Sequence, residues 1–165
     1  MTMDTSSKTI TTMETINFIF EINYITMSDC VQFISSSNLK LILLACNDGN
    51  LEDLKKLLNI IYSDKSVVYD NDYKEYVALL PFIIVNMNHT ISEQILNLFL
   101  NKIDINFAPI HNLGYFTPLH ALAFSMRSIN ANTEIIYLLI CKLIANGADE
   151  TIQWNGKTYE QIIKN

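Results

Sequence analysis

The chain has 165 residues, of which 50% are hydrophobic and 17% charged, so it can bury a sizeable core and is too apolar to remain disordered. Its 11 Lys and Arg against 17 Asp and Glu give a net charge of −6. This balance argues against nucleic-acid binding, because phosphate recognition depends on clustered basic residues. The longest apolar run, residues 77–85, is interrupted by Pro81 and is far shorter than the ~20 residues of a membrane helix.

The three cysteines, Cys30, Cys46 and Cys141, lie far apart and form no Cys-x-x-Cys pair. Such cysteines are typical of thiols in a reducing compartment. The first residues also lack the basic region that opens a secretory signal peptide. We therefore predict an intracellular, cytoplasmic protein without a membrane segment.

The N-terminal part, residues 1–37, is predicted to be an arm separate from a domain over residues 38–165. Residues 1–15 are rich in Thr and Ser, so the arm is expected to be partly disordered. Residues 16–37 fit either an alternating strand or one helix face. We favour a helix, because an isolated strand would have no pairing partner. Met27 is an alternative start to the first residue.

From residue 38 onward, apolar residues recur at spacings of three and four, as on one face of a helix. Asn50 is placed to cap a helix, and Thr90 and Glu93 have the spacing of a capping box. We predict seven helices, over residues 39–47, 51–61, 75–87, 91–101, 117–124, 133–145 and 158–164.

The predicted helices form pairs that repeat along the chain. The second helices of successive pairs end near Leu58, Leu100 and Ile144, which are 42 and 44 residues apart. A period of 20–50 residues indicates stacked repeats, in which each pair buries its apolar face on a neighbour. The long connections, Ser63–Lys74 and Lys102–Phe116, are predicted to be irregular loops.

Four segments resemble the ankyrin-repeat family. Residues 117–123, Thr-Pro-Leu-His-Ala-Leu-Ala, resemble the opening helix of an ankyrin repeat, and residues 146–149, Asn-Gly-Ala-Asp, resemble its closing turn. Residues 155–158 resemble the start of another repeat, and residues 44–52 resemble the turn within one. The resemblance implies an all-α, ankyrin-like helical repeat solenoid of about three repeats and a terminal half repeat. Because the period exceeds the family's 33 residues, a HEAT- or armadillo-like stack is the alternative.

The family resemblance implies a protein–protein interaction module, acting as a scaffold, adaptor or inhibitor through its loop tips and concave face. The acidic balance favours a protein partner with a basic patch. A structural or assembly subunit is the alternative function. The expected binding residues lie in the loops where ankyrin fingers project and combine aromatic anchors with acids; Trp154 fits packing on a neighbouring repeat equally well. These residues are Asp70, Asn71, Asp72, Tyr73, Asn106, Phe107, His111, Asn112, Gln153 and Trp154.

The sequence contains no catalytic motif, so we expect no enzyme activity, cofactor, metal ion or small-molecule substrate. By resemblance, His120 is expected to form hydrogen bonds between neighbouring turns. Asp70 and Asp72 suggest a calcium loop, but Glu75 occupies the position where an EF-hand needs glycine. An enzyme on a HEAT-like scaffold is the less favoured alternative, because it would require a cluster of ionisable groups.

Overall fold

The computed structural model describes residues 31–72, 74–109, 114–129 and 131–165. The prediction for residues 16–30 falls outside them. The compact unit Gln32–Asn165 contains all described elements. In chain order they are β1 (Gln32–Phe33), α2 (Ser36–Asn47), α3 (Leu51–Leu58), β2 (Ser66–Asp70), β3 (Glu75–Ala78), α4 (Leu79–Asn86), α5 (Glu93–Leu100), α6 (Pro118–Ser125), α7 (Thr133–Ala145) and α8 (Tyr159–Lys164).

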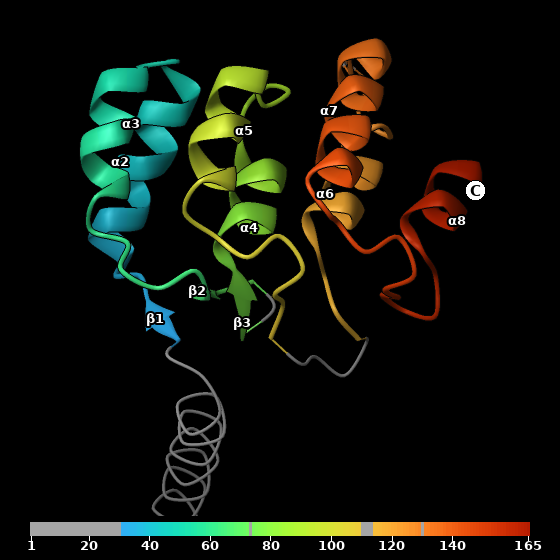
Figure 1. Cartoon of the computed structure of the whole chain (residues 1–165), viewed down its shortest axis with the longest axis horizontal. Coiled ribbons are helices and arrows are strands. Elements are labelled where there is room, and N and C mark those ends of the chain that lie inside the picture. Colours follow the sequence, from blue (N-terminus) through green and yellow to red (C-terminus); the bar gives the residue numbers. More distant parts are fainter. Residues whose placement is uncertain (1–30, 73, 110–113, 130) are drawn as a thin grey trace, which may run out of the picture. The chain divides into compact units, whose positions relative to one another are not determined.

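The helices of this unit lie in two layers (Figure 1). Within one layer, α4 packs against α6 and α6 against α8; within the other, α3 packs against α5. Helices α2 and α3 form one pair across the layers, and α6 and α7 form another. The core between the layers includes the fully buried side chains of Leu80, Phe99 and Leu122. Each helix pair therefore buries its apolar face on its neighbours.

A three-stranded sheet of order β1-β2-β3 accompanies the helices, so the prediction of an all-α, ankyrin-like solenoid is wrong. Strand β1 runs parallel to β2, with Phe33 opposite Val67. Strand β2 runs antiparallel to β3, from Val67 opposite Ala78 to Asp70 opposite Glu75. In the described part of the chain, seven helices and this mixed sheet form an α/β fold.

The predictions for the segment between α3 and α4 are wrong on two points. The expected loop Ser63–Lys74 contains β2, and the expected helix 75–87 begins with β3, so α4 starts only at Leu79. The strands form for two reasons, the local preference of the residues and their packing in the folded protein. Valine and tyrosine favour extended backbone, and Val67 and Val68 point to opposite faces of the sheet. Both are buried, which holds β2 between two packed surfaces.

Strand β1 is anchored through the side chain of Gln32, which is 7% exposed. Its Nε2 donates to the carbonyl oxygen of Ile60 at 2.9 Å, and its Oε1 accepts from the backbone N–H groups of Tyr62 at 2.8 Å and Ser63 at 3.3 Å. The buried amide is thus satisfied by the chain that leaves α3. For residues 32–33 the preference for a helix is wrong, because β2 supplies the pairing partner.

Helix ends follow from side-chain caps. The predicted cap of α3 is confirmed, since Asn50 Oδ1 accepts from the Asp53 N–H at 3.1 Å. The predicted capping box of Thr90 and Glu93 is wrong, because Ser92 caps α5 through the Ile95 N–H at 3.2 Å. Helix 133–145 is confirmed at both ends. Apart from α4, which starts four residues later than predicted, the other helices differ from their predicted ranges by up to three residues at an end.

Candidate protein-binding surface

Three connections between the two helix layers project from the same edge of the unit (Figure 1). We call this the loop edge and define it by its described stretches: residues 69–72 and 74–75 of the β2–β3 hairpin, residues 104–107, residues 114–116 and the hairpin 153–157. Loops between packed elements tolerate varied side chains and commonly carry binding residues. We therefore ask which of the predicted binding residues lie at the loop edge and are accessible there.

The β2–β3 hairpin ends in an acidic turn. Asp70 is half-buried, and its Oδ1 accepts from the Asp72 N–H at 2.9 Å, which closes a turn of the Asx type. Lys74 completes the reversal with a φ of 56°. Asn71 and Asp72 are exposed at the tip. Asp70 thus shapes the turn, whereas Asn71 and Asp72 are the residues that can reach a partner.

Asn106 joins two neighbouring connections within the fold. Its Nδ2 donates to the Gly147 carbonyl oxygen at 2.9 Å, and its Oδ1 accepts from the Asp149 N–H at 2.7 Å. Asp104 Oδ1 in turn accepts from the Asn106 N–H at 2.9 Å. Phe107, like Asn106, is half-buried. Asn106 is therefore engaged in holding two connections together, and both predicted binding residues are only partly available to a partner.

Trp154 belongs to an aromatic cluster against α6. Its ring lies edge-on to Phe116 at 5.3 Å and to Phe124 at 5.2 Å, measured between ring centroids. Its backbone pairs with Lys157 in both directions, at 2.9 and 3.1 Å. Asn155 and Gly156 occupy the turn with φ values of 51° and 68°, the left-handed geometry of a tight hairpin. The half-buried indole therefore packs inside this cluster, which favours the packing interpretation over a purely exposed anchor.

The structure brings only part of the predicted site together. Gln153 is exposed and lies beside residues 114–115, because its carbonyl oxygen accepts from the Tyr115 N–H at 3.1 Å. Tyr73, His111 and Asn112 fall outside the described residues. Two exposed aromatics at the loop edge are absent from the predicted set: Tyr69 is 40% exposed and Tyr115 is 44% exposed. In the sequence, the feature that could have identified them is that both are aromatic residues next to a predicted loop.

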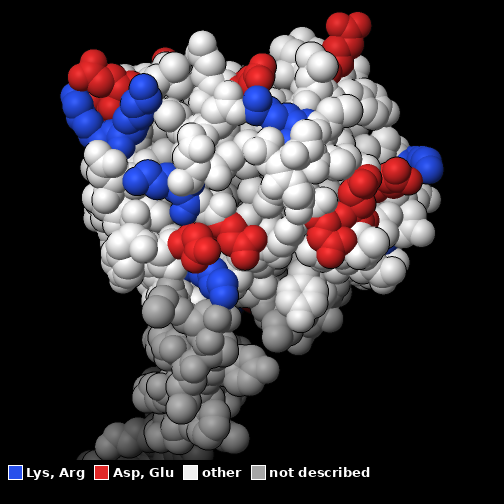
Figure 2. Space-filling view, viewed as in Figure 1, with Lys and Arg blue, Asp and Glu red and all other residues white. Residues whose placement is uncertain are grey.

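Charge is spread over the visible face in small groups. Figure 2 shows small groups of charged side chains, several of which place basic beside acidic residues, on a surface that is otherwise largely uncharged. One acidic group lies over the lower middle of this face and another over its right side. Such a distribution does not form the continuous basic footprint that a nucleic-acid backbone requires.

His120 is buried and bridges two neighbouring turns, which confirms its predicted structural role. Its Nδ1 accepts from the Thr117 N–H at 3.2 Å, which completes a capping box at the start of α6. Its Nε2 lies 3.3 Å from the carbonyl oxygen of Lys157 and donates to it in the neutral tautomer. Burial lowers the pKa of His120, although hydrogen bonds to backbone carbonyls oppose that shift. The ring is thus held neutral and occupied at both nitrogens.

His89 also bridges two segments, but it is exposed and its pKa is shifted in the opposite direction. Its Nε2 lies 3.0 Å from the Asn47 carbonyl oxygen at the end of α2, and its Nδ1 lies 3.1 Å from the Thr90 carbonyl oxygen. Only the doubly protonated ring can donate to both oxygens. The hydrogen bonds to Asn47 and then Thr90 raise the pKa of His89. The end of a helix also favours a cation through the helix dipole.

The two histidines predict opposite dependences of stability on pH. Because the folded-state pKa of His89 is raised, its stabilisation is complete below the ordinary pKa of about 6.5 and is lost as pH rises through the folded value. Because the folded-state pKa of His120 is lowered, the stabilisation by this residue is lost as pH falls below about 6.5 towards the folded value.

Urea unfolding at several pH values tests both roles. The free energy of unfolding of His89→Gln should approach that of the wild type at high pH. His120→Gln, which keeps a capping side chain, should remove part of the acid sensitivity. Parallel pH profiles for both variants would contradict these roles.

Other reactive side chains offer little chemistry in the described part of the chain. Burial raises the pKa of the Cys46 thiol to about 12, so it is not a nucleophile at neutral pH. No group of three or more His, Cys, Asp or Glu is placed to hold a metal ion among the described residues. No helix in that part of the chain is long and apolar enough to cross a bilayer.

Comparison with known proteins gives no family for this chain: no model of a known protein family matches it, and no curated protein matches it significantly.

Proposed function

We propose that this chain is a protein-binding module that contacts its partner through the loop edge. The observation that supports this best is the projection of successive connections from one edge of the helix layers (Figure 1). Tyr69 and Tyr115 are partly exposed there, at 40% and 44%. Partly exposed tyrosines favour binding, because they bury a large area at a low entropic cost.

The partner we propose is a protein with a basic patch. Asn71 and Asp72 are exposed at the tip of the β2–β3 hairpin, and the chain as a whole carries a net charge of −6. Complementary charge mainly increases the association rate and fixes orientation, while apolar and aromatic anchors set the dissociation rate. In this proposal Asp72 steers the partner and Tyr115 holds it.

A relationship to the ankyrin family is part of the proposal and concerns residues 114–165. It is supported by the capping box between Thr117 and His120, by Pro118 in the first turn of α6, and by Gly147 with a φ of 92° after α7. The β1–β3 sheet has no counterpart in that resemblance.

We further propose that the protein binds its partner without catalysing a reaction and that it does so in the cytoplasm. His120 uses both ring nitrogens within the fold, so it is not available as a general base. The thiols of Cys46 and Cys141 are both free, which suits a reducing compartment. We propose no cofactor, nucleic acid or membrane as partner.

The proposal predicts that Tyr115→Ala weakens binding to a captured protein about tenfold or more, the size of an aromatic hot spot. Asp72→Asn should slow association, with an effect that shrinks in high salt. The partner would be obtained by affinity capture from a native lysate, and crosslinks mapped by mass spectrometry would locate it. Binding kinetics of purified proteins would then give both rates.

Matched controls separate this surface from the rest of the molecule. Leu44→Ala removes an apolar side chain that is 57% exposed on α2, and Glu52→Gln removes a charge at the start of α3, away from the loop edge. Neither should change binding. Crosslinks confined to residues 1–37, or a larger loss with Leu44→Ala than with Tyr115→Ala, would rule out the loop edge.

A further inference from the structure

Helix α7 carries an apolar face that no described element covers. Tyr137 is 51% exposed and Leu138 is 69% exposed, and Cys141 is exposed one turn further along. Cys141 lies four residues after Tyr137 and three after Leu138, so it shares a helix face with each of them and the three side chains form one broad stripe. Large apolar side chains grouped on one helix face mark an interaction site more often than isolated ones do.

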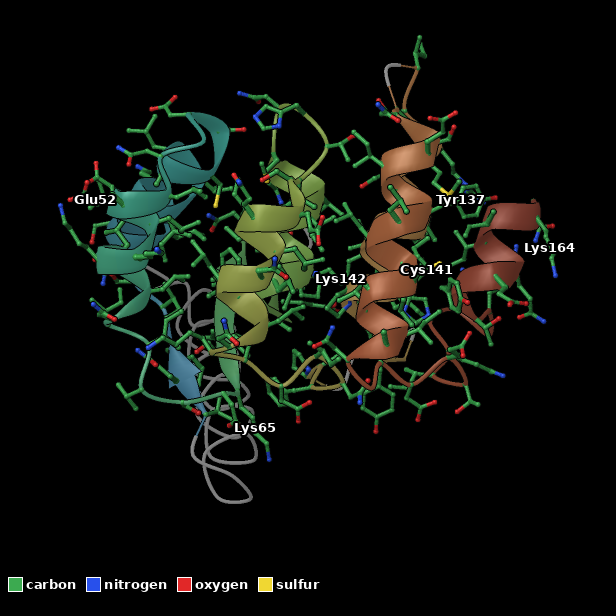
Figure 3. All side chains as sticks on the ribbon, turned by 45° about the horizontal axis from the view of Figure 1, so that its top comes forward. Glu52, Lys65, Tyr137, Cys141, Lys142 and Lys164 are labelled. Atoms are coloured by element: carbon green, nitrogen blue, oxygen red, sulfur yellow. The ribbon has the colours of Figure 1, made fainter. Side chains whose placement is uncertain are left out.

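The position of this stripe follows from the layer order. On one side of α7, Lys142 Nζ lies 2.6 Å from Glu93 Oε1 of α5, which joins the two neighbouring helices of that layer. Figure 3 shows Lys142 on this side and Tyr137 and Cys141 on the side towards α8. Helix α8 packs against α6 in the other layer. Among the described elements, α6 therefore has a neighbouring helix on both sides in its layer, whereas α7 has one only on the side of α5.

The two terminal helices differ in what they expose. The exposed side chains of α8 are polar, namely Glu160, Gln161 and Lys164. A helix face of polar side chains is the ordinary face towards solvent. The stripe on α7 lacks this character. It has the composition of a helix face that packs against another helix.

Carboxylates border the stripe at the α8 end. Tyr159 Oη donates to Glu150 Oε2 at 2.7 Å. Burial raises the pKa of Tyr159, and the hydrogen bond to Glu150 and the carboxylates of Glu150 and Glu160 raise it further; Cys141 also lies close to this phenol. Glu134 is exposed at the other end, in the first turn of α7. The apolar stripe is therefore flanked by acidic side chains at both ends.

We propose that Tyr137, Leu138 and Cys141, bordered by Glu134, Glu150 and Glu160, form a docking face for an amphipathic helix of another protein. The docked helix lies beside α7 in the same layer as α3 and α5 and carries Lys or Arg next to its apolar side. It is a surface separate from the loop edge and does not depend on the function proposed above.

A second copy of this chain is the less suitable occupant. If two α7 helices paired antiparallel, Glu134 of one copy would face the Glu150 end of the other. If they paired parallel, each carboxylate would face its own equivalent. Like charges placed opposite each other cost binding energy, whereas a helix with basic flanks would neutralise them.

The test uses a displayed library of helix-restrained peptides of about four turns, selected on the full-length protein. Enriched peptides should share apolar residues at spacings of three and four and carry Lys or Arg beside them. Their affinity should fall about tenfold or more for Leu138→Glu, because the variant places a charge where the peptide buries apolar area. Hydrogen exchange should slow in the complex at residues 133–145 of α7 or at residues 159–164 of α8.

The matched control is Leu44→Glu, which changes a leucine that is 57% exposed on α2 and should leave peptide affinity within about twofold of wild type. Tyr115→Ala should likewise bind the peptides normally, which separates this face from the loop edge. The proposal is overturned if no selected peptide depends on Leu138. It is also overturned if sedimentation shows self-association that Leu138→Glu abolishes, since the occupant is then a second copy.

Discussion

Replacing Leu119 by alanine is expected to lower the free energy of unfolding by about 2–5 kcal/mol, the range for large-to-small changes in a core. Leu119 is 2% exposed in the first turn of α6, the helix that packs against both α4 and α8. The cavity would open where two neighbouring helix pairs meet, and the rigid helices around it can close it only in part. Urea unfolding followed by circular dichroism measures the change.

The comparison for this variant is Leu44→Ala. Leu44 is 57% exposed on α2, so its truncation should change stability by about 0.5 kcal/mol or less. A Leu119→Ala loss below about 1 kcal/mol would contradict the packing of α6 between its neighbours.

Gly114→Ala is expected to be the second strongly destabilising change. Gly114 has a φ of 105°, and a Cβ built there would lie 2.7 Å from the Gln153 carbonyl oxygen. A residue with a side chain costs roughly 1–3 kcal/mol in such a backbone conformation. The contact adds to this cost, because the obstacle is backbone that is itself held by the Tyr115 N–H at 3.1 Å. The variant should also loosen the Trp154 hairpin, which near-UV circular dichroism reports.

Gly147→Ala separates these two causes. Gly147 has a φ of 92°, but a Cβ built there meets no atom within 4 Å. It should therefore show the cost of the backbone conformation alone. If the two variants are equally destabilised, the close approach between residues 114 and 153 does not constrain the fold.

The two proposed surfaces lie on different kinds of structure. The loop edge consists of connections shaped by Asx turns and hairpins, whereas the docking face lies on one rigid helix. Substitutions at Tyr115 and Leu138 therefore test them independently. Because Tyr115 is partly exposed and Leu138 largely exposed, neither substitution should change the melting temperature much, so losses of binding can be read directly.

Polar side chains explain how neighbouring units keep their register. Gln32 and His120, which are buried, and Asn106, which is half-buried, each bond to backbone groups at least 28 residues away in the sequence. Losing Gln32 or His120 would leave buried polar groups without a partner, which costs about 1–3 kcal/mol. Two of the three, Asn106 and His120, were identified from the sequence, but Asn106 as a binding residue.

The sequence by itself determined the helices whose signals are local. Helix α7, Thr133–Ala145, has a long apolar periodicity, and the cap of α3 depends on Asn50 and Asp53, three residues apart. The same applies to the turn at Gly147, where a positive φ follows the end of a helix. Each of these features needs only interactions within one or two turns, so a short stretch of residues specifies it.

Only the tertiary structure decided the sheet and the exposure of the predicted site. Val67 and Val68 extend as a strand because Phe33 and Ala78 flank them, and the parallel pairing joins segments 34 residues apart. The side chain of Asn106 is occupied by hydrogen bonds to Gly147 and Asp149, and the ring of Trp154 packs against Phe116 and Phe124. Strand pairing and burial depend on which distant segments meet, because a hydrogen bond or an apolar contact stabilises a residue only when its partner is in place.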